Sequence, residues 1–184
     1  MMSRIIALVL IILLSPIFIS VSLLIFVIDG LPIIYIQKNY GLNNEVFNLY
    51  KFRTMNKNAP ELPTEEFNNA QKYISKLGGI LRKFSFDELP QFFNILKGDM
   101  HFIGPRPSMV DCEENIKEMR ELKDLHKIKP GITGLAQVNG RDSNSYARKV
   151  ELDYEYMKNS NFYMDMKIVL KTFYVIFFPK NIKH

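Results

Sequence analysis

The chain has 184 residues, of which 24 are Lys or Arg and 19 are Asp or Glu, so its formal net charge is +5. This length fits one domain of ordinary size with a small appendage, and the modest positive charge favours anionic partners such as lipid headgroups or phosphates. The single Cys112 excludes an internal disulfide, and the three histidines lack the spacing of a metal site. Neither a nucleotide-binding glycine motif nor a nucleic-acid-binding motif is present, so no nucleic-acid partner is expected.

The first segment, from Ile5 to Ile28, is a run of 24 uncharged residues. A straight helix of this length would cross the hydrocarbon core of a bilayer, which is about 30 Å thick. Hydropathy alone therefore predicts a simple span, and a cleaved signal peptide is a second alternative. Pro16 removes a backbone hydrogen bond in mid-segment, and Ser15 can bond a freed group. Arg4 precedes the segment and all other basic residues follow it, which favours a turn at Ser15-Pro16 that keeps both ends in the cytoplasm.

The rest of the chain predicts a mixed domain with short elements. Alternating apolar residues around a Gly-Leu-Asn-Asn turn predict a hairpin from about Ile33 to Phe52. Residues 56–70 are polar, contain two prolines and predict a surface loop. The further predicted elements are helices over 71–83 and 88–96, an extended loop over 101–108, a helix over 111–127, a glycine-punctuated loop over 129–141 and a helix over 146–158.

The final stretch, "MDMKIVLKTFYVIFFPKNIKH", is apolar but contains Lys167 and Lys171. Too few apolar residues follow one another without interruption for a membrane span. A basic helix with a broad apolar face suits a membrane surface, and a core helix with snorkelling lysines is an equally good interpretation. Together with the first segment, this tail favours a domain seated on a bilayer.

Two neighbouring carboxylates, Asp87 and Glu88, lie in "RKFSFDELPQFFNIL". A structural interpretation makes Asp87 the N-cap of a helix that starts at Glu88, or makes Ser85 and Glu88 a capping box. Adjacent helical positions point about 100° apart, so the pair cannot flank a glycosidic bond as a glycosidase pair does. A functional interpretation fits adjacency better: one carboxylate attacks phosphorus, and its neighbour binds Mg²⁺ in another direction.

Three further features predict phosphate contacts. Lys51 and Arg53 in "YKFRTM" share one face of an expected strand, since residues two apart lie on the same face. Arg106 stands between two prolines in "GPRP", which limits its backbone freedom and favours a fixed guanidinium. The loop "KPGITGLAQVNGR" offers glycine amides to an anion. Its candidate substrate or phosphate contacts are Gly134, Gln137 and Arg141.

These motifs together resemble the bacterial sugar transferase family. "LLSP" in an apolar leader, "YKFRTM", "FSFDELPQFFNILKGDM", "FIGPRP" and "KPGITGLAQVNGR" occur in the family's order, from about Arg4 to Lys171. Members are monotopic phosphoglycosyl transferases, which begin glycoconjugate assembly on polyprenol phosphate. The chain looks like the minimal form that contains only the catalytic domain.

The resemblance implies an α+β fold on the membrane surface, mostly helical, with a short β-hairpin. Residues 1–30 would be a re-entrant membrane helix broken at Ser15-Pro16, and residues 31–184 a cytoplasmic catalytic domain. The expected location is the cytoplasmic face of the bacterial inner membrane, with the lipid bilayer as a partner and a homo-oligomer left open.

The resemblance also implies an activity. Asp87 would attack the sugar-bearing phosphate of a UDP-sugar, release UMP and hold the phospho-sugar covalently until polyprenol (undecaprenyl) phosphate accepts it. Mg²⁺ is the family's cofactor, with Glu88 as its expected ligand. Lys51 and Arg106 would contact phosphate, and Asp153 in "VELDYEYMKN" matches another functional acid of the family. The product would enter bacterial exopolysaccharide, capsule, O-antigen or glycoprotein glycan biosynthesis.

Two departures from the family stand out. Only "MMSR" precedes the apolar segment, where the family has a longer basic stretch, and Asn39 stands where an arginine is expected, with Lys38 beside it. Two alternatives to the family's activity are a conventional glycosyltransferase that releases UDP and a non-catalytic membrane scaffold. The scaffold would leave Asp87 as a mere helix cap.

Overall fold

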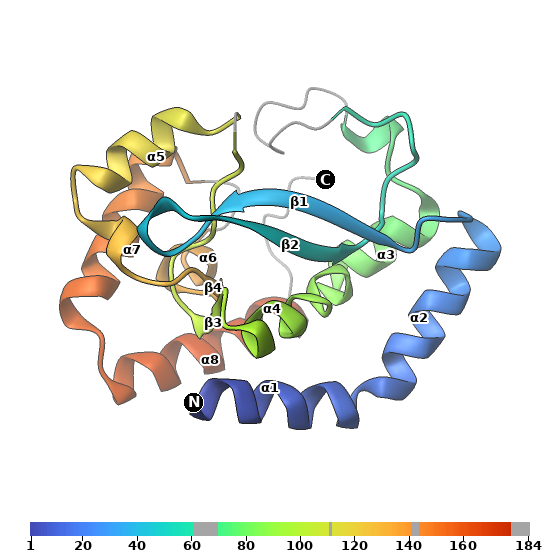
Figure 1. Cartoon of the computed structure of the whole chain (residues 1–184), viewed down its shortest axis with the longest axis horizontal. Helices are drawn as coiled ribbons and strands as arrows, with labels where there is room; N and C mark the ends of the chain where they lie inside the picture. The colour runs from blue at the N-terminus through green and yellow to red at the C-terminus, as the bar shows by residue number, and fades with distance from the viewer. Residues whose placement is uncertain (61–69, 111, 141–143, 178–184) are drawn as a thin grey trace. The chain divides into compact units, whose positions relative to one another are not determined.

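The computed structural model describes residues 1–60, 70–110, 112–140 and 144–177 of the chain (Figure 1). Its elements form two compact units. The first is built from residues 1–37 and 48–98, and the second from residues 38–47 and the described residues from 99 onward. The β-hairpin contributes its base to the first unit and its tip to the second. The predicted α+β fold with short strands is confirmed.

The first unit begins with two apolar helices, α1 (Met2–Leu13) and α2 (Ser15–Ile28), which meet at Leu14. Pro16 lies in the first turn of α2, where its missing N–H costs no helical hydrogen bond. Among the described residues no single helix is long and apolar enough to span a membrane. Helices α1 and α2 together reach the required length and hydropathy, with a bend of 62° between them. The bend is visible in Figure 1 and lies at Leu14, directly before the Ser15-Pro16 pair at which the sequence predicts a break.

Large apolar side chains remain exposed along both helices. Ile12 is 66% exposed and Val27 is 77% exposed, although each lies inside an apolar helix. The opposite faces are buried, with Ala7 and Ile25 both at 0% exposure. Each helix therefore has one face packed on protein and one apolar face that the described protein residues leave uncovered.

The core of the first unit joins α2 to the hairpin and to α3 (Lys76–Lys83). Its buried members are Val21, Ile25, Phe52 and Leu81. The Phe18 ring packs on the Phe52 ring at 5.9 Å between centroids, so α2 and the hairpin share one apolar cluster. Ser75 caps α3 by accepting a hydrogen bond from the Gly78 amide at 2.9 Å.

The hairpin pairs β1 (Ile34–Tyr40) with β2 (Val46–Phe52) as a two-stranded sheet. A short 3₁₀ turn, η1 (Leu42–Asn44), connects them, with Asn43 and Asn44 at positive φ, which asparagine tolerates. The side chain of Asn94, on α4 (Gln91–Lys97), accepts from the Tyr50 amide at 3.1 Å and donates to the Asn48 carbonyl at 2.7 Å. This fully buried amide thus satisfies backbone groups of β2 as a further strand would.

The second unit contains a short parallel pair, β3 (His101–Ile103) with β4 (Gly131–Thr133), in the register His101 to Gly131 and Ile103 to Thr133. Its helices are α5 (Glu114–Glu121), α6 (Leu135–Val138), α7 (Tyr146–Asn159) and α8 (Phe162–Phe177). Ile116, Leu125 and Val150 form a buried cluster that joins α5, the 3₁₀ turn η4 (Leu125–Lys127) and α7.

Several element predictions need correction. The glycine-punctuated stretch is not only a loop, since it forms β4 and α6, and the extended loop over 101–108 opens with β3. The helix predicted over 71–83 is a 3₁₀ turn, η2 (Ala70–Lys72), followed by α3. These elements have three to eight residues each, too few for a periodic pattern. The hairpin and the helix at 146–158 are confirmed, and part of the loop predicted at 56–70 lies outside the described residues.

Gly78→Ala and Gly79→Ala, two neighbouring substitutions on α3, should have opposite effects on stability. A Cβ on Gly78 would lie 2.7 Å from the carbonyl carbon of Thr54, while a Cβ on Gly79 would meet only the Ile74 side chain, at 4.0 Å. Gly78→Ala should therefore lower the free energy of unfolding by about 2 kcal/mol. Gly79→Ala should raise it by about 0.5–1 kcal/mol, because alanine favours the helix.

Denaturant unfolding of both variants beside the unmodified protein measures this difference. Equal effects of the two substitutions would contradict the close approach of α3 to Thr54.

Candidate active site

The acid pair lies in a 3₁₀ turn, η3 (Phe86–Glu88), just before α4. Both Asp87 and Glu88 are half-buried. The preceding Ser85 adopts a left-handed conformation, with φ of 57°, and makes no side-chain capping bond. The N-cap position of α4 is occupied by Pro90. Both capping interpretations are therefore wrong: Asp87 is not the N-cap of the helix, and Ser85 does not form the capping bond of a capping box.

Lys51 and Arg53 have different surroundings, although both belong to the first unit. The Lys51 ammonium donates to the Gln37 side chain across the hairpin at 3.0 Å, and Lys51 remains half-buried. Arg53 lies just past the end of β2 and is only 7% exposed. One of its terminal nitrogens donates to the carbonyls of Asp29 and Gly30, at 2.5 and 2.7 Å.

This position gives Arg53 a structural role. Asp29 is the C-cap of α2, and a guanidinium at a helix C-terminus stabilises the partial negative charge of the last carbonyls. Two other guanidinium nitrogens, Nε and Nη1, are buried without a partner in the described part of the chain. A phosphate contact by Arg53 stays a prediction, as does one by Lys51.

Arg106 is held in the second unit by bonds to both of its proline neighbours. The carbonyl of Pro105 accepts from the Gly131 amide at 2.9 Å, and the carbonyl of Pro107 accepts from the Asn39 side chain at 3.2 Å. The prolines therefore restrict φ, while hydrogen bonds fix the peptide planes. Arg106 itself is exposed.

Asn39, which replaces an expected arginine, has a defined place. It is only 2% exposed and forms an antiparallel bridge with Met109. Next to it, the Tyr40 amide donates to the Ser108 carbonyl at 2.9 Å. The tip of the hairpin thus binds the loop that carries Arg106.

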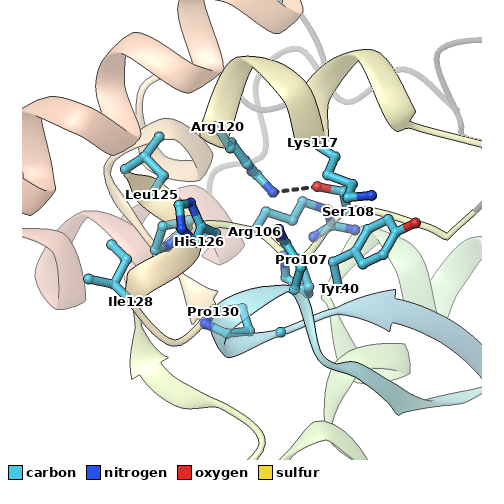
Figure 2. Close-up of a pocket in the computed structure, with 13 residues that line it drawn as sticks. Tyr40, Arg106, Pro107, Ser108, Lys117, Arg120, Leu125, His126, Ile128 and Pro130 are labelled. Carbon is cyan, nitrogen blue, oxygen red and sulfur yellow. Dashed lines mark hydrogen bonds between the residues drawn. The ribbon is translucent and has the colours of Figure 1, made fainter. Parts of the chain in front are cut away.

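Asp153 lies on α7 and is 1% exposed, so it is not the solvated acid that its helical position suggests. Its carboxylate pairs with Arg120 at 3.1 Å, and the same guanidinium donates to the Ser108 hydroxyl at 2.6 Å (Figure 2). Burial raises the pKa of Asp153 to about 6, against the opposing effect of Arg120. Asp153 therefore acts through Arg120 on the loop next to Arg106.

The glycines of "KPGITGLAQVNGR" permit close backbone packing. A Cβ on Gly134 would lie 3.1 Å from the Gly104 carbonyl carbon, and one on Gly104 would lie 2.6 Å from the Lys129 oxygen. The Gly131 amide already donates within the protein, to Pro105. Both amide atoms of Gln137 are buried without a partner among the described residues. Arg141 lies outside the described residues, and contacts of Gly134, Gln137 and Arg141 with substrate stay predictions.

Arg120 and Ser108 are the positions that sequence patterns missed. Arg120 falls in a helix of mixed charge, which predicts a solvated face, and a lone serine after "GPRP" carries no signal. Asp87, Glu88, Lys51 and Arg53 belong to the first unit, while Arg106, Gly134, Gln137 and Asp153 belong to the second.

Comparison with known proteins places the chain in a family. The model of the bacterial sugar transferase family matches residues 1–179. The chain belongs to this family. A relative at 42% identity over 147 residues is the uncharacterized sugar transferase EpsL of Bacillus subtilis (strain 168), with 78% of this chain and 69% of the relative covered.

Two further relatives differ in how much of their length this bacterial sugar transferase spans. The UDP-glucose:undecaprenyl-phosphate glucose-1-phosphate transferase of Escherichia coli (strain K12) is 34% identical over 182 residues, covering 96% of this chain but 39% of the relative. The exopolysaccharide production protein ExoY of Sinorhizobium fredii is 37% identical over 182 residues, covering 91% of this chain and 80% of the relative.

Acidification should stabilise the protein relative to its Asp153→Asn variant. The pKa of about 6 in the folded state lies above the usual value of about 3.9, so the folded state binds this proton more readily than the unfolded state. The resulting stabilisation is complete below about pH 4 and is lost as the pH rises through about 6. The difference in unfolding free energy between the two proteins should change by up to about 3 kcal/mol.

Denaturant unfolding of both proteins over a pH series measures this change, and the variant cancels the contribution of every other titrating group. If the unmodified protein instead loses stability relative to the variant on acidification, the ion pair with Arg120 outweighs burial.

Proposed function

We propose that the protein transfers a phospho-sugar from a UDP-sugar to polyprenol phosphate and releases UMP. The observation that carries the proposal is the place of Asp87, which is half-buried in a 3₁₀ turn and does not cap α4. A partly accessible carboxylate can act as a nucleophile toward phosphorus. The named activity of the Escherichia coli relative and the role of the Sinorhizobium fredii relative in exopolysaccharide production support the same class of reaction.

In the proposed first step, a carboxylate oxygen of Asp87 attacks the sugar-bearing phosphorus of the UDP-sugar. A bond forms between this oxygen and phosphorus, and the bond from phosphorus to the bridging oxygen breaks. The bridging oxygen leaves with its electron pair as part of UMP. The phospho-sugar is then held on Asp87 as an acyl phosphate.

In the second step, a phosphate oxygen of polyprenol phosphate attacks the same phosphorus. The bond to Asp87 breaks, the carboxylate is restored, and the product is a polyprenyl diphosphate sugar. The two half-reactions use one nucleophile in turn, so nucleotide release does not require the lipid acceptor. Lys51 in the first unit and Arg106 in the second are proposed phosphate contacts, since both carry a permanent cation at a partly accessible position.

Mg²⁺ is the proposed cofactor, with Glu88 as its protein ligand. The described residues contain no group of three or more His, Cys, Asp or Glu side chains that would enclose a metal. This fits Mg²⁺, which commonly takes one or two carboxylates and completes its shell with water and substrate phosphates. When bound, Mg²⁺ neutralises phosphate charge, which would otherwise repel the Asp87 carboxylate.

The acceptor is a lipid, and the helices α1 and α2 support a membrane location. Their bend of 62° and their exposed apolar side chains fit a segment that enters a bilayer and returns to the same side. On α8 a second row of exposed apolar residues, including Met166, Leu170 and Phe177, fits the membrane surface. We propose the cytoplasmic face of the bacterial inner membrane as the location.

Asp87→Asn should abolish formation of UMP. Protein in detergent or nanodiscs is incubated with Mg²⁺, polyprenol phosphate and a panel of UDP-sugars, and UMP is separated from UDP. Loss of the nucleophile should lower the rate at least about 1,000-fold, because an amide cannot form the acyl phosphate. Asp124→Asn is the matched control, since Asp124 forms an exposed ion pair with Lys127 and should leave the rate unchanged.

Isotope exchange tests the covalent step separately. Labelled UMP should enter the UDP-sugar pool without any polyprenol phosphate, and Asp87→Asn should prevent this exchange. UDP in place of UMP would show simple glycosyl transfer, and full activity of Asp87→Asn would contradict Asp87 as the nucleophile. Release of neither nucleotide across the panel would favour the scaffold interpretation.

Cysteine labelling tests the membrane topology. In a Cys112→Ser background, Ser3→Cys and Glu118→Cys place one thiol before the bend and one on α5 of the second unit. A membrane-impermeant maleimide should label neither in intact cells and both after lysis, since a re-entrant segment keeps both on the cytoplasmic side. Labelling of Ser3→Cys alone in intact cells would show a simple span.

A further inference from the structure

The second unit contains a pocket whose lining residues, apart from Arg106, have no role in the proposed catalytic steps. It lies between the tip of the hairpin, the loop after Gly104, α5 and η4 (Figure 2). Its empty volume is about 350 Å³, part of which is open solvent. The space that a water-sized molecule can occupy in it is far smaller, about 30 Å³. The pocket can therefore hold one small group of a larger molecule and not a whole substrate.

Positive charge dominates the lining. Arg106, Lys117 and Arg120 are cations, and His126 can become one, while none of the described residues that line the pocket is acidic. Two carboxylates outside the lining hold two of these cations in place. Asp153 pairs with Arg120 at 3.1 Å, and Glu114 pairs with Lys117 at 3.3 Å.

Backbone and ring contacts make the pocket rigid. The loop that carries Arg106 is fixed by its prolines and by the hairpin tip. The Lys117 ammonium lies 4.8 Å from the centroid of the Tyr40 ring, and the Tyr40 hydroxyl donates to Glu114 at 2.5 Å. Because these side chains are already positioned, little conformational entropy would be lost when an anion binds.

The pocket is also short of hydrogen-bond acceptors. In the described part of the chain, Nε of Arg120 and Nδ1 of His126 are buried without a partner. A buried Nε–H donor without an acceptor is costly, and an anion adds acceptor oxygens to this environment. Leu125 and Ile128 add apolar surface to the lining. The pocket therefore combines cationic donors with an apolar wall.

We propose that this pocket binds the phosphate group of a phosphate ester. Guanidinium and ammonium donors match phosphate oxygens, and the apolar residues suit the organic part of an ester. The proposal rests on the proposed function for the source of the ligand, which is either the nucleotide part of the UDP-sugar or the polyprenyl phosphate. The bound chemistry is the same for both sources.

Direct binding to the detergent-held full chain tests the pocket. UMP, UDP, inorganic phosphate and a short polyprenyl phosphate are each titrated by calorimetry. Lys117→Gln should weaken binding of the ligand that uses the pocket about 10-fold, because a charge-assisted hydrogen bond is lost. Lys123→Gln is the matched control, since Lys123 pairs with Glu151 outside the pocket and should change affinity less than about 2-fold.

Arg120→Gln would leave Asp153 buried without its partner and could fail to fold, so Lys117→Gln is the deciding variant. If Lys117→Gln binds UMP and UDP more weakly, the ligand of the pocket is the nucleotide. If it binds polyprenyl phosphate more weakly, the ligand is the lipid. Weaker binding of inorganic phosphate alone assigns free phosphate, which supports a phosphate pocket without an ester. The proposal would be overturned if Lys117→Gln bound every anion as tightly as the unmodified protein does. It would also be overturned if the unmodified protein bound none of them.

The same titrations on Asp87→Asn separate the two proposals. If Asp87→Asn binds these ligands normally but releases no UMP, the result supports both the pocket and the proposed function. If the unmodified protein releases no UMP with any UDP-sugar of the panel while Lys117→Gln weakens binding, the proposed function fails and the pocket stands. If Lys117→Gln binds normally while Asp87→Asn is inactive, the pocket fails and the proposed function stands.

Discussion

Pro105 and Pro107 have no backbone N–H, so on either side of Arg106 the chain can only accept backbone hydrogen bonds. The two proline carbonyls accept the bonds that connect this loop to the rest of the second unit. The carbonyl of Pro105 is bonded by the Gly131 amide from β4, and that of Pro107 by the Asn39 side chain from the hairpin. Two segments distant in sequence therefore meet at one exposed arginine. The loop cannot relax without losing both bonds, so its cation and the pocket beside it keep a defined geometry.

A buried ion pair is a second restraint on this loop. Arg120 joins Asp153 on α7 to the hydroxyl of Ser108. Breaking such a pair by removing one partner is costly, because the other charge remains buried. Burial raises the pKa of Asp153 above its usual value, although Arg120 opposes this shift. Asp153 is therefore connected to the loop through its ion pair with Arg120, which also contacts Ser108.

In the first unit Arg53 connects distant segments in a similar way. Its guanidinium bonds the carbonyls at the end of α2, and its backbone N–H donates to the Ile33 carbonyl at 2.9 Å. The Ser75 hydroxyl donates to the Asp29 carboxylate at 2.8 Å, which links the same helix end to the start of α3. The apolar helices are thereby attached to the unit that carries Asp87 and Glu88. The two bent apolar helices and the acid pair therefore belong to one compact unit.

Local sequence determined the elements whose signal is local. The turn residues Asn43 and Asn44 and the alternating strands specify the hairpin. The ordered motifs specify the family, and Pro16 predicts a break next to the observed bend. The adjacency of Asp87 and Glu88 also excluded a glycosidase pair without any structure. Only the tertiary structure decided the partners of Arg53, Arg120 and Asp153 and the parallel pairing of β3 with β4. Strands of three residues have no periodic pattern, and a charge pattern cannot tell a solvated acid from a buried one, because burial depends on which distant segments fold over it.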